Sequence, residues 1–201
     1  EKQNCLPKFP PILVRGAADD HVFAVNPSAP AYETHRPGSD QEEFFKEQLI
    51  RSTGIITSTN YLKKVYTTLN PNIFVVPNAI DFETWGKLAR PKPHKRIRIG
   101  WAGGGTHVDD LNFIIPAIEK VISKNKNVEF VFLGGVPENL KNKEKVTALY
   151  KWFPIDKYPQ ELSNLGLDIA LAPLRDNPFN RGKSNLRWLE YSALKIPTIA
   201  S

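Results

Sequence analysis

The sequence predicts an α/β protein built on parallel sheets. Short apolar segments alternate with longer amphipathic ones almost throughout the 201 residues, as in strands joined by crossover helices. The segments 128–133 and 169–172 are apolar at nearly every position, which is typical of strands that helices cover on both faces. Hydrophobic residues make up 41% of the chain and charged residues 24%, which excludes a disordered or fibrous protein.

Each expected element follows from this alternation and from the punctuating prolines and glycines. Strands are predicted, in order, at 12–16, 54–58, 73–76, 97–102, 128–133, 168–174 and 197–200. Helices are predicted at 40–51, 60–69, 108–124, 138–150, 159–165 and 184–195, and the Pro-, Ser- and Gly-rich stretch 26–41 is expected to be an irregular loop.

The chain is expected to divide at residues 90–96, which we predict to be a linker between a unit at 1–89 and a unit at 97–201. Residues 90–95 hold two prolines, three charges and no apolar side chain. The charge changes at the same place: residues 1–90 have ten basic and ten acidic side chains, whereas 91–201 have seventeen and eleven. The net charge of +6 therefore lies in the second part, which fits either an anionic partner or a solvated lysine-rich surface.

Several classes of protein are excluded or disfavoured by composition. The lone Cys5 can form neither an intramolecular disulfide nor a cysteine-rich zinc site, and no apolar run is long enough to span a membrane. We therefore expect a cytoplasmic protein, with peripheral membrane contact left open. The four histidines lack ligand spacing, so no metal is expected. The missing methionine and the final strand-like residues suggest a piece of a longer protein.

A glycine-rich turn is the clearest local motif. Gly103, Gly104 and Gly105 follow a predicted strand, and Thr106 is placed to cap the helix that comes next. Backbone N–H groups and a helix N-terminus suit a phosphate, although a tight turn that needs left-handed residues would also use glycine. The turn lacks the lysine of a P-loop and the third glycine of a dinucleotide fingerprint, so NAD is not expected.

A second candidate for anion binding follows the predicted strand 168–174. Arg181 and Lys183 come just before a helix that Ser184 could cap, which places two cations beside a helix N-terminus. On that helix, Glu190 falls on the apolar stripe, and a buried carboxylate needs a hydrogen-bonding partner. Either ligand hydroxyls or a structural arginine could supply it.

Other candidates are weaker. Asp19 and Asp20 end a predicted strand and could face a cleft on an acceptor side, although such pairs are commonly turn formers. His107 is expected to be a surface histidine that at most touches a phosphate. The tryptophans do not interleave with basic residues, so nucleic acid is not an expected partner.

The order of motifs resembles the group 1 glycosyltransferases. The motifs are Val-Val-Pro-Asn-Ala-Ile-Asp at 75–81, Gly-Trp-Ala-Gly-Gly at 100–104, Leu-Gly-Gly at 133–135, Asp-Ile-Ala-Leu-Ala-Pro-Leu at 168–174, Lys-Ser at 183–184 and Leu-Glu-Tyr at 189–191. The resemblance covers roughly 54–201. It implies a GT-B fold of two Rossmann-like domains, with 1–89 the remnant of the acceptor-side domain and 97–201 a nucleotide-sugar domain truncated at its C-terminal end.

The resemblance also implies roles for matching positions. The glycine loop would lie against a donor diphosphate, Arg181 and Lys183 would neutralise the leaving group, and Glu190 would hold the ribose. The reaction would be metal-independent transfer from a nucleoside-diphosphate sugar, with retention, to a glycan, lipid or protein acceptor, and without a cofactor. One departure is Gly182, which stands where the family has the first of two glutamates.

We therefore predict a glycosyltransferase. The alternative is a non-catalytic α/β module that binds a nucleotide or a partner on the same scaffold. RNA binding through the basic second part is a third interpretation, and the scattered lysines give it little support.

Overall fold

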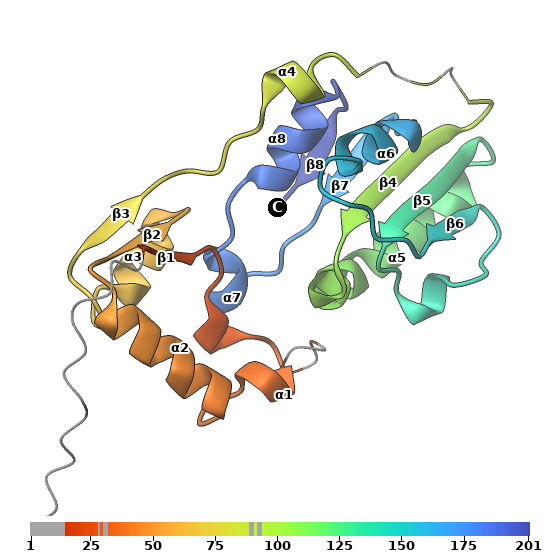
Figure 1. Ribbon diagram of the computed structural model, residues 1–201. Coiled ribbons are helices and arrows are strands. Elements are labelled where there is room, and N and C mark those ends of the chain that lie inside the picture. The colour runs from red at the N-terminus through yellow and green to blue at the C-terminus, as the bar shows by residue number, and fades with distance from the viewer. Residues whose placement is uncertain (1–14, 28, 30–31, 89–90, 92–93) are drawn as a thin grey trace, which may run out of the picture.

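The computed structural model describes residues 15–27, 29, 32–88, 91 and 94–201, so the first half of the strand predicted at 12–16 lies outside the described residues. Two parallel sheets form the molecule (Figure 1). The first sheet has the order β1-β2-β3, with β1 at Arg15–Ala18, β2 at Gly54–Thr57 and β3 at Ile73–Val75. The second sheet has the order β6-β5-β4-β7-β8, and all pairings in both sheets are parallel. The predicted α/β class is confirmed.

Helices in the connections pack against the first sheet and form a hydrophobic core with it. The connections hold η1 (Val22–Ala24), α1 (Tyr32–His35), α2 (Asp40–Arg51) and α3 (Asn60–Tyr66). Ser39 caps α2 by accepting a hydrogen bond from the backbone N–H of Glu42, and Thr59 caps α3 in the same way from Leu62. The prediction of an irregular loop at 26–41 is partly wrong, because the short helix α1 forms within this stretch.

The second sheet is covered on both faces. Its strands are β4 (Ile97–Gly103), β5 (Val128–Gly134), β6 (Val146–Leu149), β7 (Ile169–Ala172) and β8 (Thr198–Ala200), and its main helices are α5 (Val108–Lys124), α6 (Tyr158–Asn164) and α8 (Leu186–Ala193). Alternate residues of β4 enter different cores, since Trp101 packs with Leu111 of α5 while Ala102 packs with Tyr191 of α8. This alternation between two helical layers explains the apolar runs in the sequence.

One predicted helix is absent. Residues 138–150 form the 3₁₀ turn η3 (Glu138–Leu140) and then the edge strand β6. Asn142 and Lys145 between them have φ angles of 59° and 63°, which an α-helix cannot contain. The lysines and glutamates that favoured a helix instead lie on exposed turns, where the pairs Lys141–Glu138 and Lys143–Glu119 form.

The chain crosses from the first sheet to the second before the expected linker, and it returns to the first sheet after it. The short helix α4 (Phe82–Trp85) already packs on the second sheet, where Trp85 is buried in its core. The helix α7 (Pro178–Arg181) returns to the first sheet, and His21 Nδ1 donates to the carbonyl of Pro178 at 3.2 Å. The passage at 76–79 therefore precedes residues 90–96, three of which lie outside the described residues.

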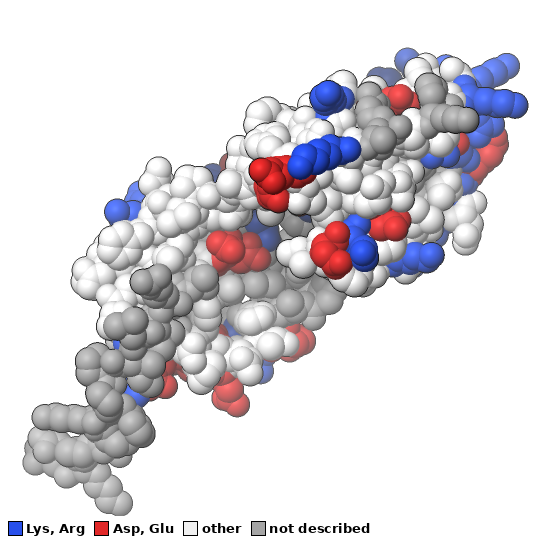
Figure 2. Space-filling view, turned by 45° about the horizontal axis from the view of Figure 1, so that its top comes forward, with Lys and Arg blue, Asp and Glu red and all other residues white. Residues whose placement is uncertain are grey.

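On the face shown in Figure 2, basic side chains gather mainly over the part that contains the second sheet. This distribution agrees with the charge excess of residues 91–201. Within the described residues, no helix combines the length and the apolar character needed to cross a membrane.

Candidate functional site

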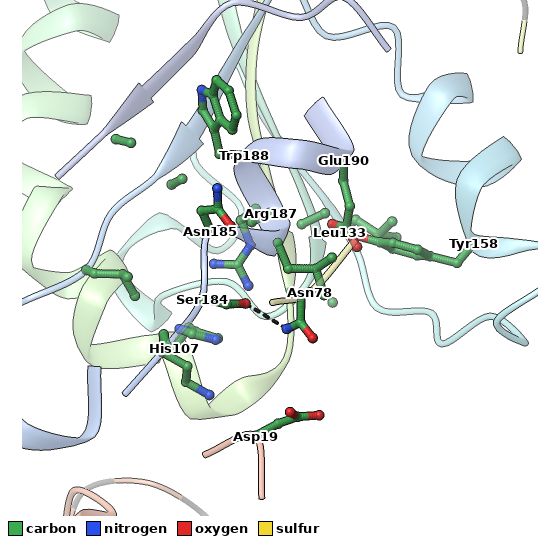
Figure 3. A pocket seen from close by; sticks show the side chains of 18 of the residues that line it. Asp19, Asn78, His107, Leu133, Tyr158, Ser184, Asn185, Arg187, Trp188 and Glu190 are labelled. Atoms are coloured by element: carbon green, nitrogen blue, oxygen red, sulfur yellow. Dashed lines mark hydrogen bonds between the residues drawn. The ribbon is translucent and has the colours of Figure 1, made fainter. Parts of the chain in front are cut away.

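A cavity of about 760 Å³ lies between the two sheets, at the carboxyl ends of β4 and β7. These strands are neighbours, but the chain first runs outward from β4 to β5 and β6 before it crosses back to β7. Ligands of open α/β sheets bind at such a switch point. Asp19, Asp20 and Asn78 line the cavity from the first sheet and its following segment. Figure 3 shows Asp19 and Asn78 among the lining side chains.

Close approach, rather than a left-handed turn, explains the first glycine of the loop. Gly103 lines the cavity, and a Cβ there would lie 2.6 Å from both the Arg187 guanidinium and the Trp101 ring. None of the three loop glycines has a positive φ. Gly134 of β5 does, at 95°, and a Cβ on it would lie 2.1 Å from the carbonyl oxygen of Gly103. Gly104 and Gly105 are not among the lining residues.

Both predicted helix caps are wrong. A 3₁₀ turn at Gly105–His107 precedes α5, so that exposed Thr106 lies inside this turn, outside the cavity lining, and caps nothing. The helix α8 begins one residue later than its predicted cap would require, after Asn185. The hydroxyl of Ser184 instead accepts a hydrogen bond of 2.7 Å from Asn78 Nδ2, which joins the two sides of the cavity.

His107 is buried rather than on the surface. It is 9% exposed and lines the cavity, and its Nδ1 donates to Asp110 Oδ2 at 2.9 Å. Asp110 also accepts hydrogen bonds from the backbone N–H of Arg175 at 2.9 Å and from Asn180 Nδ2 at 2.7 Å. Burial lowers the pKa of His107, and the cations Arg187 and Lys183 lower it further, against the opposing effect of Asp110. The sequence showed only the i, i+3 spacing of His107 and Asp110.

Three cations, Lys151, Lys183 and Arg187, line the cavity, and of these only Lys183 is a predicted site residue. Lys183 lines it, is 17% exposed and forms an ion pair of 2.7 Å with Asp20 across the gap between the sheets. Arg187, on the first turn of α8, lines it as well and stacks over Trp101 at 5.1 Å from the ring centroid. Sequence reasoning missed Arg187.

The placement of Arg181 needs a correction. Its side chain is 57% exposed, is not among the lining residues, and forms two parallel hydrogen bonds with Asp176, at 2.6 and 2.9 Å. The Asp176 carboxylate, five residues earlier, binds two of the three guanidinium nitrogens of Arg181 and so holds this side chain at the surface. The predicted pair of cations thus includes one residue that the fold does not bring to the cavity.

Glu190 lies half-buried in the cavity wall, as its place on the apolar stripe predicts. Tyr158 Oη donates to Glu190 Oε2 at 3.2 Å. The hydrogen-bonding partner in the structure is therefore a tyrosine, whereas the sequence suggested either a ligand or an arginine. Burial raises the pKa of Glu190, while Arg187 and the Tyr158 hydroxyl act in the opposite direction. The remaining carboxylate lone pairs can accept hydrogen bonds from ligand hydroxyls.

An apolar wall continues from Tyr158 along the same segment. Trp152 is 83% exposed and Ile155 is 91% exposed, and both line the cavity together with Phe153. Large apolar side chains left open beside a polar floor are typical of ligand sites. Tyr158 contacts Glu190, whereas Trp152 lies beside Gly104, 3.3 Å from where a Cβ on that glycine would stand.

Gly182 is buried where the two sheets meet. A Cβ on it would lie 2.9 Å from the Leu62 side chain and 3.2 Å from that of His21. Its carbonyl accepts a hydrogen bond from the Thr59 hydroxyl at 3.2 Å. A side chain at this position would therefore require the Leu62 side chain to shift.

The acidic residues of the first sheet do not form a metal site. Asp19 lines the cavity, and Asp20 is held by Lys183 and, through its carbonyl, by the Tyr66 hydroxyl. Across the described ranges, no three His, Cys, Asp or Glu side chains gather so as to hold a metal ion. Metal-independent chemistry remains a prediction.

Comparison with known proteins supports the fold. No protein-family model matches the chain, and no curated protein matches its sequence. Among solved structures, it is similar to a variant of Staphylococcus aureus TarM, crystallised with fondaparinux, α-GlcNAc-glycerol and UDP, with a TM-score of 0.57 and 15% identity. A Listeria monocytogenes protein described as a UDP-N-acetylglucosamine 2-epimerase matches with a TM-score of 0.46 and 10% identity over 89% of this chain and 48% of its own.

The similarity to TarM covers 92% of this chain and 36% of TarM, so the chain spans little more than a third of that protein's length. The two parallel sheets with a cavity between their carboxyl ends, together with this structural similarity, give the chain a fold of the GT-B type.

Proposed function

We propose that the cavity binds a nucleoside-diphosphate sugar and that the protein transfers the sugar to an acceptor. The observation that carries this proposal is the set of chemical groups gathered around one cavity. Lys183 and Arg187 line it at the switch point of the second sheet, together with the half-buried Glu190 and the exposed Trp152. A diphosphate, a ribose and a base require these three kinds of group, which are cations, a hydroxyl acceptor and a flat apolar surface.

In this proposal the diphosphate lies beside Gly103, where the missing side chain leaves room for the Arg187 guanidinium. The ribose hydroxyls donate to Glu190, which Tyr158 holds in place. The base packs against Trp152, whose indole is open to the cavity. The structural similarity to a protein crystallised with UDP supports a sugar-nucleotide ligand. The donor base is left to experiment.

Sugar transfer would break the bond between the anomeric carbon and the diphosphate oxygen, which leaves negative charge on the departing phosphate. Lys183 and Arg187 are placed to stabilise this charge without a metal ion. We propose retention at the anomeric carbon and an acceptor on the side of Asp19 and Asp20. Because Gly182 carries no side chain to contact the sugar, the sugar hydroxyls would meet Asp19 and the Lys183–Asp20 pair instead.

The test begins with binding. UDP, GDP and ADP are titrated into the 201-residue chain by calorimetry, with the melting temperature as a second readout; at least one of them should bind and raise the melting temperature. Lys183→Ala should weaken that binding by about 10- to 100-fold, since a charge-assisted hydrogen bond contributes about 1.5–3 kcal/mol. No binding of any diphosphate would exclude the proposed ligand.

Turnover separates the enzyme from a non-catalytic nucleotide-binding module. The protein is incubated with the sugar form of whichever nucleotide binds, and release of the free diphosphate is followed. An enzyme should release it, and Lys183→Ala should slow the release more than it weakens binding. Binding without release, in the presence of glycan, lipid and protein acceptors, would favour the non-catalytic module.

A further inference from the structure

The His107 side chain lines the cavity, and one of its two ring nitrogens forms a hydrogen bond within the protein. Nδ1 donates to Asp110 at 2.9 Å. Within the described part of the chain, the fully buried side-chain atoms without a partner are Ser58 Oγ and Trp101 Nε1. Among the described residues, Nε2 of His107 has no hydrogen-bond partner either, and it is not one of these fully buried atoms, so it keeps access to the cavity that its residue lines.

Charged side chains and an aromatic ring surround the His107 ring. Trp101 is packed against both cation and histidine: the Arg187 guanidinium lies 5.1 Å from an indole ring centroid, and the His107 ring lies edge-on at 6.2 Å. Figure 3 shows His107, Ser184 and Arg187 around the same space. The charged groups that act on the ring are Asp110 from its own helix, Lys183 from the segment before α8, and Arg187 from α8.

Asp110 can stabilise a positive ring because it is itself fixed as an anion. Burial opposes its charge, but hydrogen bonds from His107, the Arg175 N–H and Asn180 together lower the pKa of Asp110. In the empty cavity the two neighbouring cations and burial keep His107 neutral. A bound phosphate would cancel the field of these cations, so the balance would shift toward imidazolium.

We propose that His107 is the third cationic group of the anion site: when a phosphate enters the cavity, Nε2 takes a proton from solvent and donates it in a hydrogen bond to a phosphate oxygen. This inference rests on the proposed function, which places the diphosphate here, and assigns a proton-coupled step to its binding. The anion thus completes its own site, held by Lys183, Arg187 and a histidine that Asp110 supports from behind.

The experiment follows the histidine ring resonances of the wild-type chain by NMR across the pH range, with and without saturating UDP. The chain has four histidines, and a His107→Asn variant assigns the resonance of interest. We expect the titration midpoint of His107 to rise by more than one pH unit with UDP or pyrophosphate, and to stay unchanged with uridine. His35, on α1, is the internal control and should not move.

Affinity gives an independent readout. His107→Asn should weaken UDP binding about tenfold near pH 6, where the wild-type imidazolium contributes a charge-assisted hydrogen bond, and by less than about twofold near pH 8.5. His35→Asn is the matched control variant. UDP binding with an unmoved His107 midpoint would overturn this inference and leave the proposed function standing. If neither UDP nor pyrophosphate binds, both proposals fail together.

Discussion

Two loops meet at the cavity, and they contribute in different ways. The loop after β4 belongs wholly to the second sheet: it supplies a side-chain-free position at Gly103 and a histidine that Asp110 holds in place. The segment after β7 is shared between the sheets, because Lys183 reaches Asp20 and Ser184 accepts from Asn78. The first loop therefore shapes the site and adds the histidine that we propose becomes charged, whereas the second supplies Lys183 and couples the site to the first sheet.

This difference predicts which substitutions change stability and which change affinity. A substitution that adds volume to the closely packed loop after β4 should lower the free energy of unfolding. A substitution that changes the charge of the segment after β7 should change the affinity for the ligand.

Gly134→Ala should lower the free energy of unfolding by about 3 kcal/mol or more. The new Cβ would collide with the Gly103 carbonyl, 2.1 Å away, in a backbone conformation with positive φ that alanine rarely adopts. Gly104→Ala is the matched control, because its Cβ would meet only the exposed Trp152 side chain at 3.3 Å, and it should cost less than about 0.5 kcal/mol. Urea unfolding measures both; equal effects would contradict the picture of a closely packed Gly103–Gly134 contact.

Glu190→Gln should weaken UDP binding about tenfold and leave pyrophosphate binding unchanged, since only the ribose meets this residue in the proposed complex. Calorimetric titration of the two ligands distinguishes a ribose contact from a general loss of the site. A parallel loss of both ligands would show that Glu190 does not act through the ribose.

The same variant should be more stable than the wild type above neutral pH. Burial raises the pKa of Glu190 in the folded protein above its unfolded value, so the folded state is penalised wherever the carboxyl is ionised. This penalty is absent at a pH below the unfolded value and is fully present above the raised one. The advantage of Glu190→Gln in melting temperature should therefore appear near pH 8 and disappear near pH 4.

Asp20→Asn should produce the smallest effect, a tightening of UDP binding by about threefold. The Asp20 carboxylate now competes with an incoming phosphate for Lys183, and the pair is partly exposed, so its attraction is modest. The gain should be larger at low ionic strength and shrink as salt screens the pair. Weaker UDP binding by this variant would indicate that Asp20 positions Lys183 rather than competing for it.

The sequence predicted the second sheet well because its strands carry continuous apolar runs and its long helix 108–124 has a clear apolar stripe. The strand β6 was missed because an edge strand among lysines lacks that pattern. Glu190 and Lys183 could be chosen from spacing. Arg181 and Arg187 could not be told apart, since the difference depends on Asp176, which removes one of them to the surface. The burial of His107 depends on packing against Trp101 and Asp110, which spacing alone does not reveal.

Arg187 is the cation on which the proposed diphosphate site depends most, and the two arginines near the start of α8 provide a matched test. UDP is titrated into Arg187→Ala and Arg181→Ala by calorimetry at one pH and one ionic strength. We predict a loss of about 10- to 100-fold in affinity for Arg187→Ala and a change below about twofold for Arg181→Ala. Equal losses, or the larger loss in Arg181→Ala, would contradict the claim that the cavity between the sheets is the diphosphate site.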